Sequence, residues 1–283
     1  MTPFWVPLVA ALLLIAHPVS AEALARRVVS LNPSLSEILI ELGAAEVLGG
    51  GDAASRRQRP ELARLPSVGG LFDPSLEGVV ALRPDLVVLV PSAEQRAFPA
   101  RLVELGIRTV QFPNLHFEQV LGNIEQLGAL VGRSEAASQR VVAIRAAREA
   151  VERAVASRER VSCLVVLQRE PIFVVGAESF LDEMITSAGC DNLGRQLGPG
   201  YPRASLEWVI DSAPEVILDM SLDANGQEVA AYWQRLPAIP AVANERVELV
   251  DAQLVTMPGP ALDRAIGVLA RALHGPAFAG ANP

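Results

Sequence analysis

The sequence SLEGVVALRPDLVVL at residues 75–89 occurs a second time, with substitutions, as SLEWVIDSAPEVILD at residues 205–219. Each copy begins with a serine of the type that caps helices, continues with a short apolar-patterned turn, and reaches a proline that ends the helix. The apolar runs at 86–90 and 216–218 have the length and composition of short buried strands. A helix and a strand repeated in this way indicate two halves with one architecture.

Strands and helices alternate around both copies, which is typical of a mainly parallel sheet covered on both faces. Between the halves, apolar residues at helical spacing predict helices at 117–131 and 135–158. The second helix would be about 36 Å long at ~1.5 Å per residue, enough to bridge two lobes. We therefore expect an α/β protein in which two Rossmann-like lobes with mainly parallel sheets are joined by one long α-helix, with the ligand cleft between the lobes. The further strands are expected at 27–31, 46–48, 109–112, 161–167, 172–175 and 247–250, and the further helices at 35–42, 94–105, 179–188, 227–235 and 260–273.

The length of 283 residues favours two domains. We expect a signal peptide at 1–21, an N-terminal lobe at 22–115, connecting helices at 116–159, a C-terminal lobe at 160–275 and a flexible tail at 276–283. The apolar segment at 4–16 predicts a cleavable export signal, and an uncleaved anchor is the alternative because no Lys or Arg precedes it. Export permits disulfides, but Cys163 and Cys190 fit two buried free thiols as well as one bridge.

The composition and motifs exclude several classes of function. A net charge of −8 argues against nucleic acid as a partner, since phosphate binding needs a basic surface. We expect His274 to be exposed beside the tail and His116 to be a capping or surface residue. The sequence has no nucleophile motif and no clustered set of metal ligands, so we expect no catalytic residue and no metal site built from protein side chains.

Loops at the predicted strand ends form the candidate ligand site, because ligands of open α/β sheets bind beyond the carboxyl ends of the strands. Phe72, Phe173, Tyr201, Leu254 and Met257 lie on these loops and give a mostly apolar and aromatic lining that suits a bulky ligand. Phe72 and Phe173 fit ordinary core residues equally well.

Three motifs carry a resemblance to a known family. They are VVSLNPSLSEILIELG at 28–43, VGGLFDPSLEGVVALRPDLV at 68–87 and YPRASLE at 201–207. Together they resemble the periplasmic substrate-binding proteins of ABC importers for vitamin B12, iron-siderophores and haem, over nearly the whole mature chain. The resemblance implies two Rossmann-like lobes joined by one long helix, a shallow cleft between them and no catalysis. It also implies a monomer in the periplasm that docks onto a permease/ATPase complex in the inner membrane.

The resemblance assigns roles to particular residues. Taken alone, Glu77 and Glu207 fit solvated carboxylates near helix N-termini, where the helix dipole favours negative charge. They match the family's glutamates, one on each lobe, that dock onto permease arginines. The residues implied or expected to bind the ligand are Asn32, Pro33, Ser34, Asp52, Arg57, Gly70, Leu71, Phe72, Phe173, Tyr201, Gln253 and Met257.

The sequence departs from the cobalamin-binding pattern at positions that decide the ligand. Arg57-Gln58-Arg59-Pro60 replaces the usual Tyr-Pro-Pro, and Gln253 and Met257 replace an Asp and an Arg. Arg56, Arg57 and Arg59 suit an anionic chelate. A haem iron would require a Tyr, His or Met ligand, for which Tyr201, Met257 and His116 are the candidates.

We therefore expect the substrate-binding component of an ABC importer, which captures a cobalamin-type corrinoid or a ferric siderophore and delivers it to the permease. We expect no intrinsic cofactor, only a bound chelate that contains cobalt or iron. A haem-binding member of the same family is one alternative. A two-domain α/β hydrolase or glycosyl-transfer enzyme is another, in which Glu77 and Glu207 form an acid/base pair within ~10 Å across a cleft. A free-metal binder would instead gather His and carboxylate side chains in the cleft.

Overall fold

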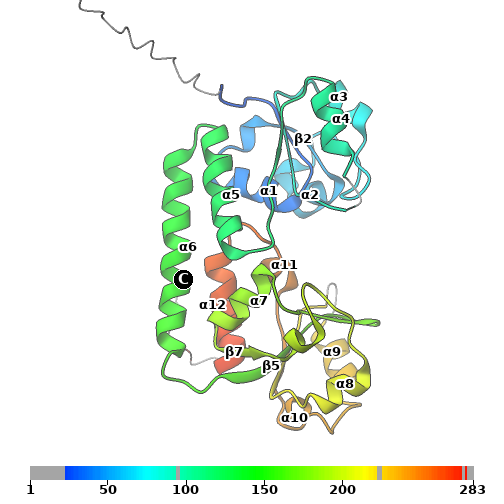
Figure 1. The fold of residues 1–283 in the computed structure, drawn as a ribbon, viewed down its shortest axis with the longest axis vertical. Coiled ribbons are helices and arrows are strands. Elements are labelled where there is room, and N and C mark those ends of the chain that lie inside the picture. Colours follow the sequence, from blue (N-terminus) through cyan, green and yellow to red (C-terminus); the bar gives the residue numbers. More distant parts are fainter. Residues whose placement is uncertain (1–22, 94–95, 222–224, 276–277, 279–283) are drawn as a thin grey trace, which may run out of the picture.

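The computed structural model describes residues 23–93, 96–221, 225–275 and 278. It consists of two α/β lobes, one above the other, connected along one side by helices (Figure 1). Helix α6, Ser134–Val155, extends along both lobes. The predicted signal peptide at 1–21 lies outside the described residues. None of the helices in the described ranges is both long and apolar enough to cross a membrane.

Each lobe is built around one sheet. The sheet of the first lobe contains β1 (Val28–Ser30), β2 (Leu48–Gly51), β3 (Leu86–Leu89) and β4 (Thr109–Gln111), all parallel, in the order β2-β1-β3-β4. The sheet of the second lobe contains β5 (Val161–Arg169), β6 (Ile172–Val174), β7 (Cys190–Asn192), β8 (Val216–Asp219) and β9 (Val247–Leu249), in the order β6-β5-β8-β9. Strand β7 pairs with the first part of β5, and only β6 is antiparallel to its neighbour. The expected fold class, two mainly parallel α/β lobes, is confirmed.

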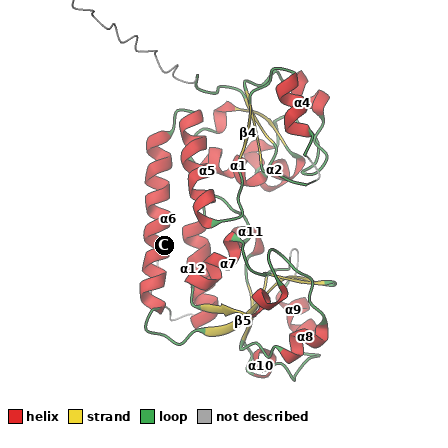
Figure 2. Ribbon diagram, viewed as in Figure 1, coloured by secondary structure: helices red, strands yellow, loops and turns green. Residues whose placement is uncertain are grey.

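Helices cover both faces of each sheet. Those of the first lobe are α1 (Pro33–Glu41), α2 (Ala53–Gln58), α3 (Leu76–Ala81) and α4 (Phe98–Glu104). Those of the second lobe are α7 (Phe180–Ser187), α8 (Leu206–Asp211), α9 (Gly226–Trp233), α10 (Pro240–Ala243), α11 (Ala252–Val255) and α12 (Leu262–His274). Helices α5 (Phe117–Leu130) and α12 pack against α6 along the connecting side, away from α8 and α9 (Figure 2).

The two copies of the sequence repeat fold alike. The Ser75 hydroxyl accepts a hydrogen bond from the Gly78 amide at 3.0 Å, and the Ser205 hydroxyl accepts one from the Trp208 amide at 3.1 Å, so each serine caps its helix. Each following strand, β3 or β8, is third in its sheet. The residue before each proline, Arg83 or Ala213, has a positive φ, of 47° and 49°. The repeat therefore specifies the same helix, turn and strand in both lobes.

A carboxylate after each proline joins the repeat to the first strand of its lobe. Asp85 accepts hydrogen bonds from the Arg26 amide at 2.9 Å and the Arg27 amide at 3.0 Å, just before β1. Glu215 accepts hydrogen bonds from the amide and the hydroxyl of Ser162 in β5, both at 2.9 Å. These hydrogen bonds, the backbone one first, lower the pKa of the Glu215 carboxyl. The two carboxylates thus set the register between strand neighbours that lie far apart in sequence.

Alternate residues of the strands belong to different cores, as the pleat requires. In β1 and β3, Val28, Leu86 and Val88 face a large core that also contains residues of the connecting helices and of the second lobe. Val29 and Val87 face a smaller core under α3 and α4. Alternate residues of β5 also face two cores. One face lies in the large core, and the other lies in a separate core with residues of α8, α9 and α10. One apolar core therefore runs from lobe to lobe through α5, α6 and α12.

The structure corrects several local expectations. The strand expected at 46–48 is a turn of 3-10 helix, Ala45–Val47, and the strand begins at Leu48. Strand β2 continues through three glycines. At Gly50 a side chain would not fit, because a Cβ there would lie 2.4 Å from Leu82 Cδ1. The loop expected after α7 contains β7, and the loop expected after β9 contains α11.

Near the C-terminus, two expectations are corrected. His274 is not exposed: its ring donates a hydrogen bond to the Ala188 carbonyl oxygen at 2.8 Å, and burial lowers its pKa. Phe278, within the expected flexible tail, is buried and stacks on His274. The remaining tail residues lie outside the described ranges. Cys163 and Cys190 form a disulfide between β5 and β7.

Helix α6 offers a test of the continuous core. Ile144 is fully buried, whereas Val142 on the same helix is 63% exposed. We expect Ile144→Ala to lower the free energy of unfolding by about 2–5 kcal/mol, because the truncation leaves a cavity in the core that both lobes share. Denaturant unfolding followed by circular dichroism should show one transition that moves as a whole.

Val142→Ala is the matched control, with an expected change within about 0.5 kcal/mol. Two separate transitions, only one of which shifts in Ile144→Ala, would contradict a core shared by the lobes.

Candidate ligand-binding site

A pocket of about 250 Å³ lies between the two lobes. From the first lobe it is lined by residues of α1 and of the end of α2, and from the second lobe by residues around α11 and the start of α12. Gln253 and Met257, both expected from the sequence to bind the ligand, lie in this lining. The complete lining is Glu37, Glu41, Gln58, Arg59, Asp251, Gln253, Leu254, Met257, Gly259, Pro260, Ala261 and Arg264.

An ion pair between Glu37 and Arg59 forms part of the first-lobe wall. The carboxylate of Glu37, on α1, accepts hydrogen bonds from Nε and a terminal nitrogen of Arg59 in a two-point contact. Glu37 is only 8% exposed, and its hydrogen bond raises the pKa of the Arg59 guanidinium. Arg59 is therefore committed to a buried carboxylate rather than free to bind an anionic ligand.

The other two arginines of this segment differ from each other. Arg56 donates a hydrogen bond to the Ala63 carbonyl oxygen at 2.9 Å and is half-buried. Arg57 is exposed on the last turn of α2. Of the three arginines expected to meet an anionic chelate, Arg59 is thus paired with a carboxylate, Arg56 donates to a backbone oxygen, and Arg57 is exposed to solvent.

Buried hydroxyls and one carboxylate support this wall. Asp52 is fully buried, and its carboxylate caps α2 by accepting hydrogen bonds from the Ala54 amide at 2.8 Å and the Ser55 amide and hydroxyl. The Ser55 hydroxyl is hydrogen-bonded to the Ser36 hydroxyl at 3.1 Å. The Ser36 hydroxyl in turn donates a hydrogen bond to the Ser30 hydroxyl at 2.9 Å. This network ties α1 and α2 to the end of β1. Asp52, expected from the sequence at the ligand surface, lies inside this support.

Asn32, Pro33 and Ser34, the N-cap and first residues of α1, lie near the second lobe. Asn32 caps α1: its side-chain oxygen accepts hydrogen bonds from the Ser34 amide at 3.0 Å and the Ser34 hydroxyl at 2.8 Å. A Cβ built on Gly259 of the second lobe would lie 3.7 Å from the Ser34 carbonyl oxygen. The start of α1 therefore adjoins the pocket, because Gly259 belongs to the pocket lining.

Phe72 is presented to solvent by a tight loop before α3. Gly69 and Pro74 form an isolated antiparallel bridge, and the Ser75 amide donates a hydrogen bond to the Val68 carbonyl oxygen at 2.6 Å. Gly69 has a φ of +108°, and a Cβ there would lie 2.6 Å from the Asp73 carbonyl oxygen, so glycine is required. The loop places Gly70, Leu71 and Phe72 at its tip, with Phe72 63% exposed.

Tyr201 occupies the corresponding place before α8 and is 45% exposed. Burial raises the pKa of its hydroxyl. Phe173, half-buried in β6, lies in an isolated bridge with Arg203. Phe173 and the segment of Tyr201 are thus linked through the bridge at Arg203. Neither of them nor Phe72 lines the pocket at Gln253 and Met257.

His116 joins the lobes rather than facing the pocket. It caps α5, and its Nδ1 lies 2.9 Å from a carboxylate oxygen of Glu183 on α7. The other oxygen of Glu183 accepts a hydrogen bond from the Phe117 amide at 2.9 Å. This second-lobe carboxylate therefore caps the first connecting helix.

Glu77 and Glu207 are exposed in the first turns of α3 and α8. These two helices lie at opposite ends of the molecule (Figure 1). The acid/base pair of the enzyme alternative requires carboxyls within ~10 Å on either side of one bond, which this placement does not provide. Within the described ranges, no group of three or more His, Cys, Asp or Glu side chains is placed to hold a metal ion.

Comparison with known proteins identifies the family. A model of periplasmic binding proteins matches residues 28–254, most of the chain. The chain belongs to the periplasmic binding protein family, and the class of protein expected from the sequence is confirmed. The family implies a location in the periplasm.

Relatives and solved structures agree with this assignment. Vitamin B12-binding proteins of Vibrio campbellii and Salmonella typhi are 28% and 26% identical to the chain, over 83% and 81% of it and 84% and 85% of their own lengths. The periplasmic vitamin B12-binding protein BtuF of Vibrio cholerae matches with a TM-score of 0.78 at 22% identity, over 88% of this chain and 96% of that one. The haem-binding protein BhuT, solved with two haems, matches with a TM-score of 0.75 at 27% identity, over 87% and 97%.

Sequence reasoning missed part of the pocket. Gln58 and Glu41 on the first lobe and Arg264 on the second lie in its lining. Glu41 and Arg264 belong to the exposed sides of predicted helices, where charge is the ordinary pattern and gives no signal. Gln58 stands between Arg57 and Arg59, so the sequence pointed to the correct segment. It did not indicate that an amide, rather than a guanidinium, lines the pocket there.

The Glu37–Arg59 pair offers a test of its structural role. We expect Arg59→Ala to lower the free energy of unfolding by about 1–2 kcal/mol, since it leaves the Glu37 carboxylate buried without its partner, and partial exposure of Arg59 limits the loss. Urea unfolding at neutral pH measures the change.

Arg57→Ala, two residues away and exposed, should change that free energy by less than about 0.5 kcal/mol. Equal losses in the two variants would mean that the ion pair contributes nothing specific.

Proposed function

We propose that this protein is the substrate-binding component of an ABC importer and that it captures a corrinoid of the vitamin B12 type. The observation that carries the proposal is the inter-lobe pocket, whose ionisable side chains are three carboxylates, Glu37, Glu41 and Asp251, and two arginines, Arg59 and Arg264. Such a pocket has no excess of positive charge to attract the carboxylates of a siderophore or the propionates of a haem.

The neutral polar groups of the pocket suit a corrinoid. A corrin ring carries amide side chains, and Gln58 and Gln253, one from each lobe, each offer an amide donor and an amide acceptor. Met257 and Leu254 add apolar surface on the second-lobe side. The names of the curated relatives at 28% and 26% identity support the same ligand class.

Exposed aromatic rings support a large, flat ligand. Phe72 and Tyr201 are 63% and 45% exposed, one on each lobe, and each stands a few residues before the cap of its outer helix. Aromatic rings contribute much contact area with little loss of rotamer freedom, which suits contact with a flat ligand. Of the other residues expected from the sequence, Gln253 and Met257 contact the ligand in this proposal, while Asn32 and Ser34 adjoin the pocket.

Haem is the second candidate, favoured by the 27% identity to BhuT. Of the possible iron ligands, His116 is paired with Glu183 and Tyr201 lies outside the pocket lining, which leaves Met257 in the pocket. This arrangement gives haem weaker support than a corrinoid.

Titration of the protein purified from its native periplasm tests the ligand class. We expect cyanocobalamin to bind with a Kd of about 1 μM or tighter, and Phe72→Ala and Tyr201→Ala each to weaken binding about tenfold through loss of ring contact. Calorimetry and the absorption spectrum of the bound fraction measure this, with haemin and a ferric catecholate titrated in parallel.

Val103→Ala removes a side chain on α4 that is as exposed as Phe72, and it should leave the affinity unchanged. Binding of haemin with a shifted Soret band, together with no binding of cyanocobalamin, would refute the corrinoid assignment.

Exposed carboxylates on the outer helices support a docking role for Glu77 and Glu207. We expect the double variant Glu77→Ala/Glu207→Ala to keep its affinity for cyanocobalamin but to lower permease-dependent uptake at least about tenfold, because two charged contacts on a rigid body set the register of docking. Uptake of labelled cyanocobalamin by cells that carry only the variant measures the effect.

The control is Glu104→Ala/Glu228→Ala, which removes one exposed carboxylate from α4 and one from α9. Wild-type uptake in the Glu77/Glu207 variant, or loss of its ligand affinity, would sink the docking assignment.

A further inference from the structure

The segment that carries Tyr201 is joined along its length to the end of β6. The Ala177 amide donates to the Gly198 carbonyl oxygen at 2.8 Å, and the Gly200 amide donates to the Ala177 carbonyl oxygen at 2.7 Å. The Gly176 amide donates to the Gly200 carbonyl oxygen at 2.8 Å. A Cβ at Gly176 would lie 2.2 Å from the Gly198 carbonyl oxygen, so the backbones are as close as they can be. Residues 198–203, here named the tyrosine loop, therefore move with β6.

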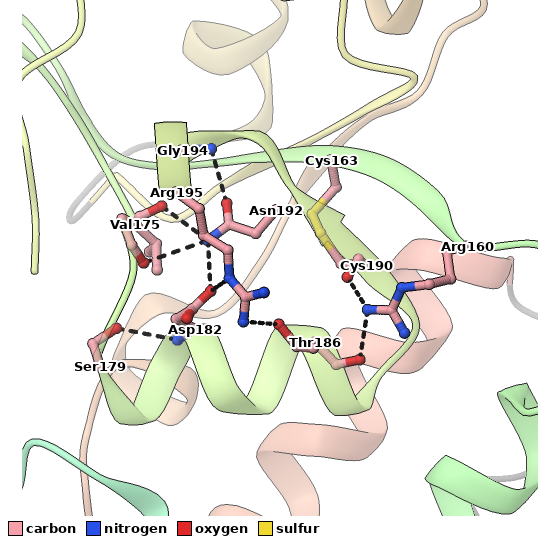
Figure 3. A network of polar contacts seen from close by, with 11 residues as sticks. Arg160, Cys163, Val175, Ser179, Asp182, Thr186, Cys190, Asn192, Gly194 and Arg195 are labelled. Atoms are coloured by element: carbon pink, nitrogen blue, oxygen red, sulfur yellow. Dashed lines mark hydrogen bonds and ion pairs between the residues drawn. A yellow bond between two sulfur atoms is a disulfide. The ribbon is translucent and has the colours of Figure 1, made fainter. Parts of the chain in front are cut away.

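A buried side chain, Asn192, holds the base of this unit (Figure 3). Its amide nitrogen lies 3.1 Å from the Val175 carbonyl oxygen and 2.9 Å from Oδ1 of Asp182. Its amide oxygen accepts a hydrogen bond from the Gly194 amide at 3.1 Å. Asn192 thus links the end of β6 to the segment that leads into the tyrosine loop and to helix α7.

Asp182 and Arg195 complete the cluster. The same Oδ1 of Asp182 accepts a hydrogen bond from Nε of Arg195 at 2.8 Å, and this bond raises the pKa of the Arg195 guanidinium. A terminal nitrogen of Arg195 donates to the Thr186 hydroxyl at 2.9 Å. Asp182 is 3% exposed, so its charge is stabilised by these two partners. Ser179 caps α7 by accepting a hydrogen bond from the Asp182 amide at 3.1 Å.

The disulfide fixes the cluster to the centre of the sheet. Cys190 stands two residues before Asn192 in β7 and is bonded to Cys163 in β5 (Figure 3). The Arg160 guanidinium donates to the Cys190 and Thr186 carbonyl oxygens. Strand β7 consequently cannot slide along β5, and Asn192 keeps its position.

We propose that Asn192, Asp182 and Arg195 are positioning residues for ligand binding: they hold the tyrosine loop so that Tyr201 is in place before the ligand arrives. The inference rests on the proposed function, because it takes Tyr201 as a ligand contact. None of the three belongs to the pocket at Gln253 and Met257, so they act through the loop. A wall that is ordered beforehand loses little conformational entropy on binding, which raises affinity without new contacts.

The test compares Asn192→Ala with Asn123→Ala. Asn123 is likewise a buried asparagine that donates to a backbone oxygen, that of Pro113 at 2.9 Å, but it lies on α5. We expect Asn192→Ala to speed hydrogen exchange at residues 176–203 about tenfold and to weaken cyanocobalamin binding about tenfold, as loss of buried hydrogen bonds allows. Asn123→Ala should lower the melting temperature while leaving both of these values as in the wild type.

If Asn192→Ala does not fold, Arg195→Ala replaces it in the test, since it truncates a half-exposed side chain. The same increase in exchange at 176–203 and the same loss of affinity are expected. Wild-type affinity in the variant overturns the inference, whether or not exchange becomes faster. If the wild-type protein binds no corrinoid, the proposed function fails separately, and the exchange measurement alone then decides: unchanged protection at 176–203 overturns the inference, and lost protection upholds the anchoring of the loop.

Discussion

The burial of one face of α6 against both lobes is the constraint on which the rest of the structure depends. Val141, Ile144 and Val151 of this helix belong to the same apolar core as the inner faces of both sheets. A flexible linker would let the lobes separate freely, whereas this core would have to open before they could rotate far. Arg140, on the same helix, donates to the Pro260 carbonyl oxygen at 2.7 Å and adds a polar link behind the pocket. We therefore expect ligand capture to proceed by small adjustments rather than by wide hinge closure.

This frame leaves the loops as the adjustable parts, and each lobe connects its aromatic loop directly to an outer helix. Phe72 is followed by the Ser75 cap and α3, and Tyr201 by the Ser205 cap and α8. Under the proposed function, the ring that contacts the ligand and the glutamate that contacts the permease belong to one short unit in each lobe. A shift of the loop on binding can thus reach the docking helix without movement of a whole lobe. The duplicated sequence acquires a functional meaning from this adjacency.

The sequence was sufficient for features that depend on neighbouring residues and insufficient for features that depend on distant ones. The repeat, the serine caps and the alternation of apolar residues in the strands are local, and they predicted the two-lobe fold. The pairing of Arg59 with Glu37 joins residues 22 positions apart, so the sequence pattern did not reveal that this arginine is bound to a carboxylate. Strand β7 has three residues and little pattern of its own; it exists because β5 offers it an edge. The bridge between Cys163 and Cys190 depended on that same pairing, so the sequence left it open.

The aromatic loops of both lobes depend on glycine backbone conformation, and the second lobe adds a buried side-chain cluster beneath its loop. In the first lobe, the shape of the Phe72 loop is set by backbone conformation, since Gly69 adopts a positive φ and has no room for a Cβ. In the second lobe, the loop of Tyr201 also has glycines at positive φ, Gly198 and Gly200, but it depends in addition on a buried cluster of side chains around Asp182 and Asn192. A backbone turn at positive φ with no room for a Cβ accepts only glycine. A hydrogen-bonded cluster is destabilised when a single partner is lost, because the remaining polar groups are then buried without partners. The second lobe is therefore the side on which substitutions far from the ligand are expected to alter its binding.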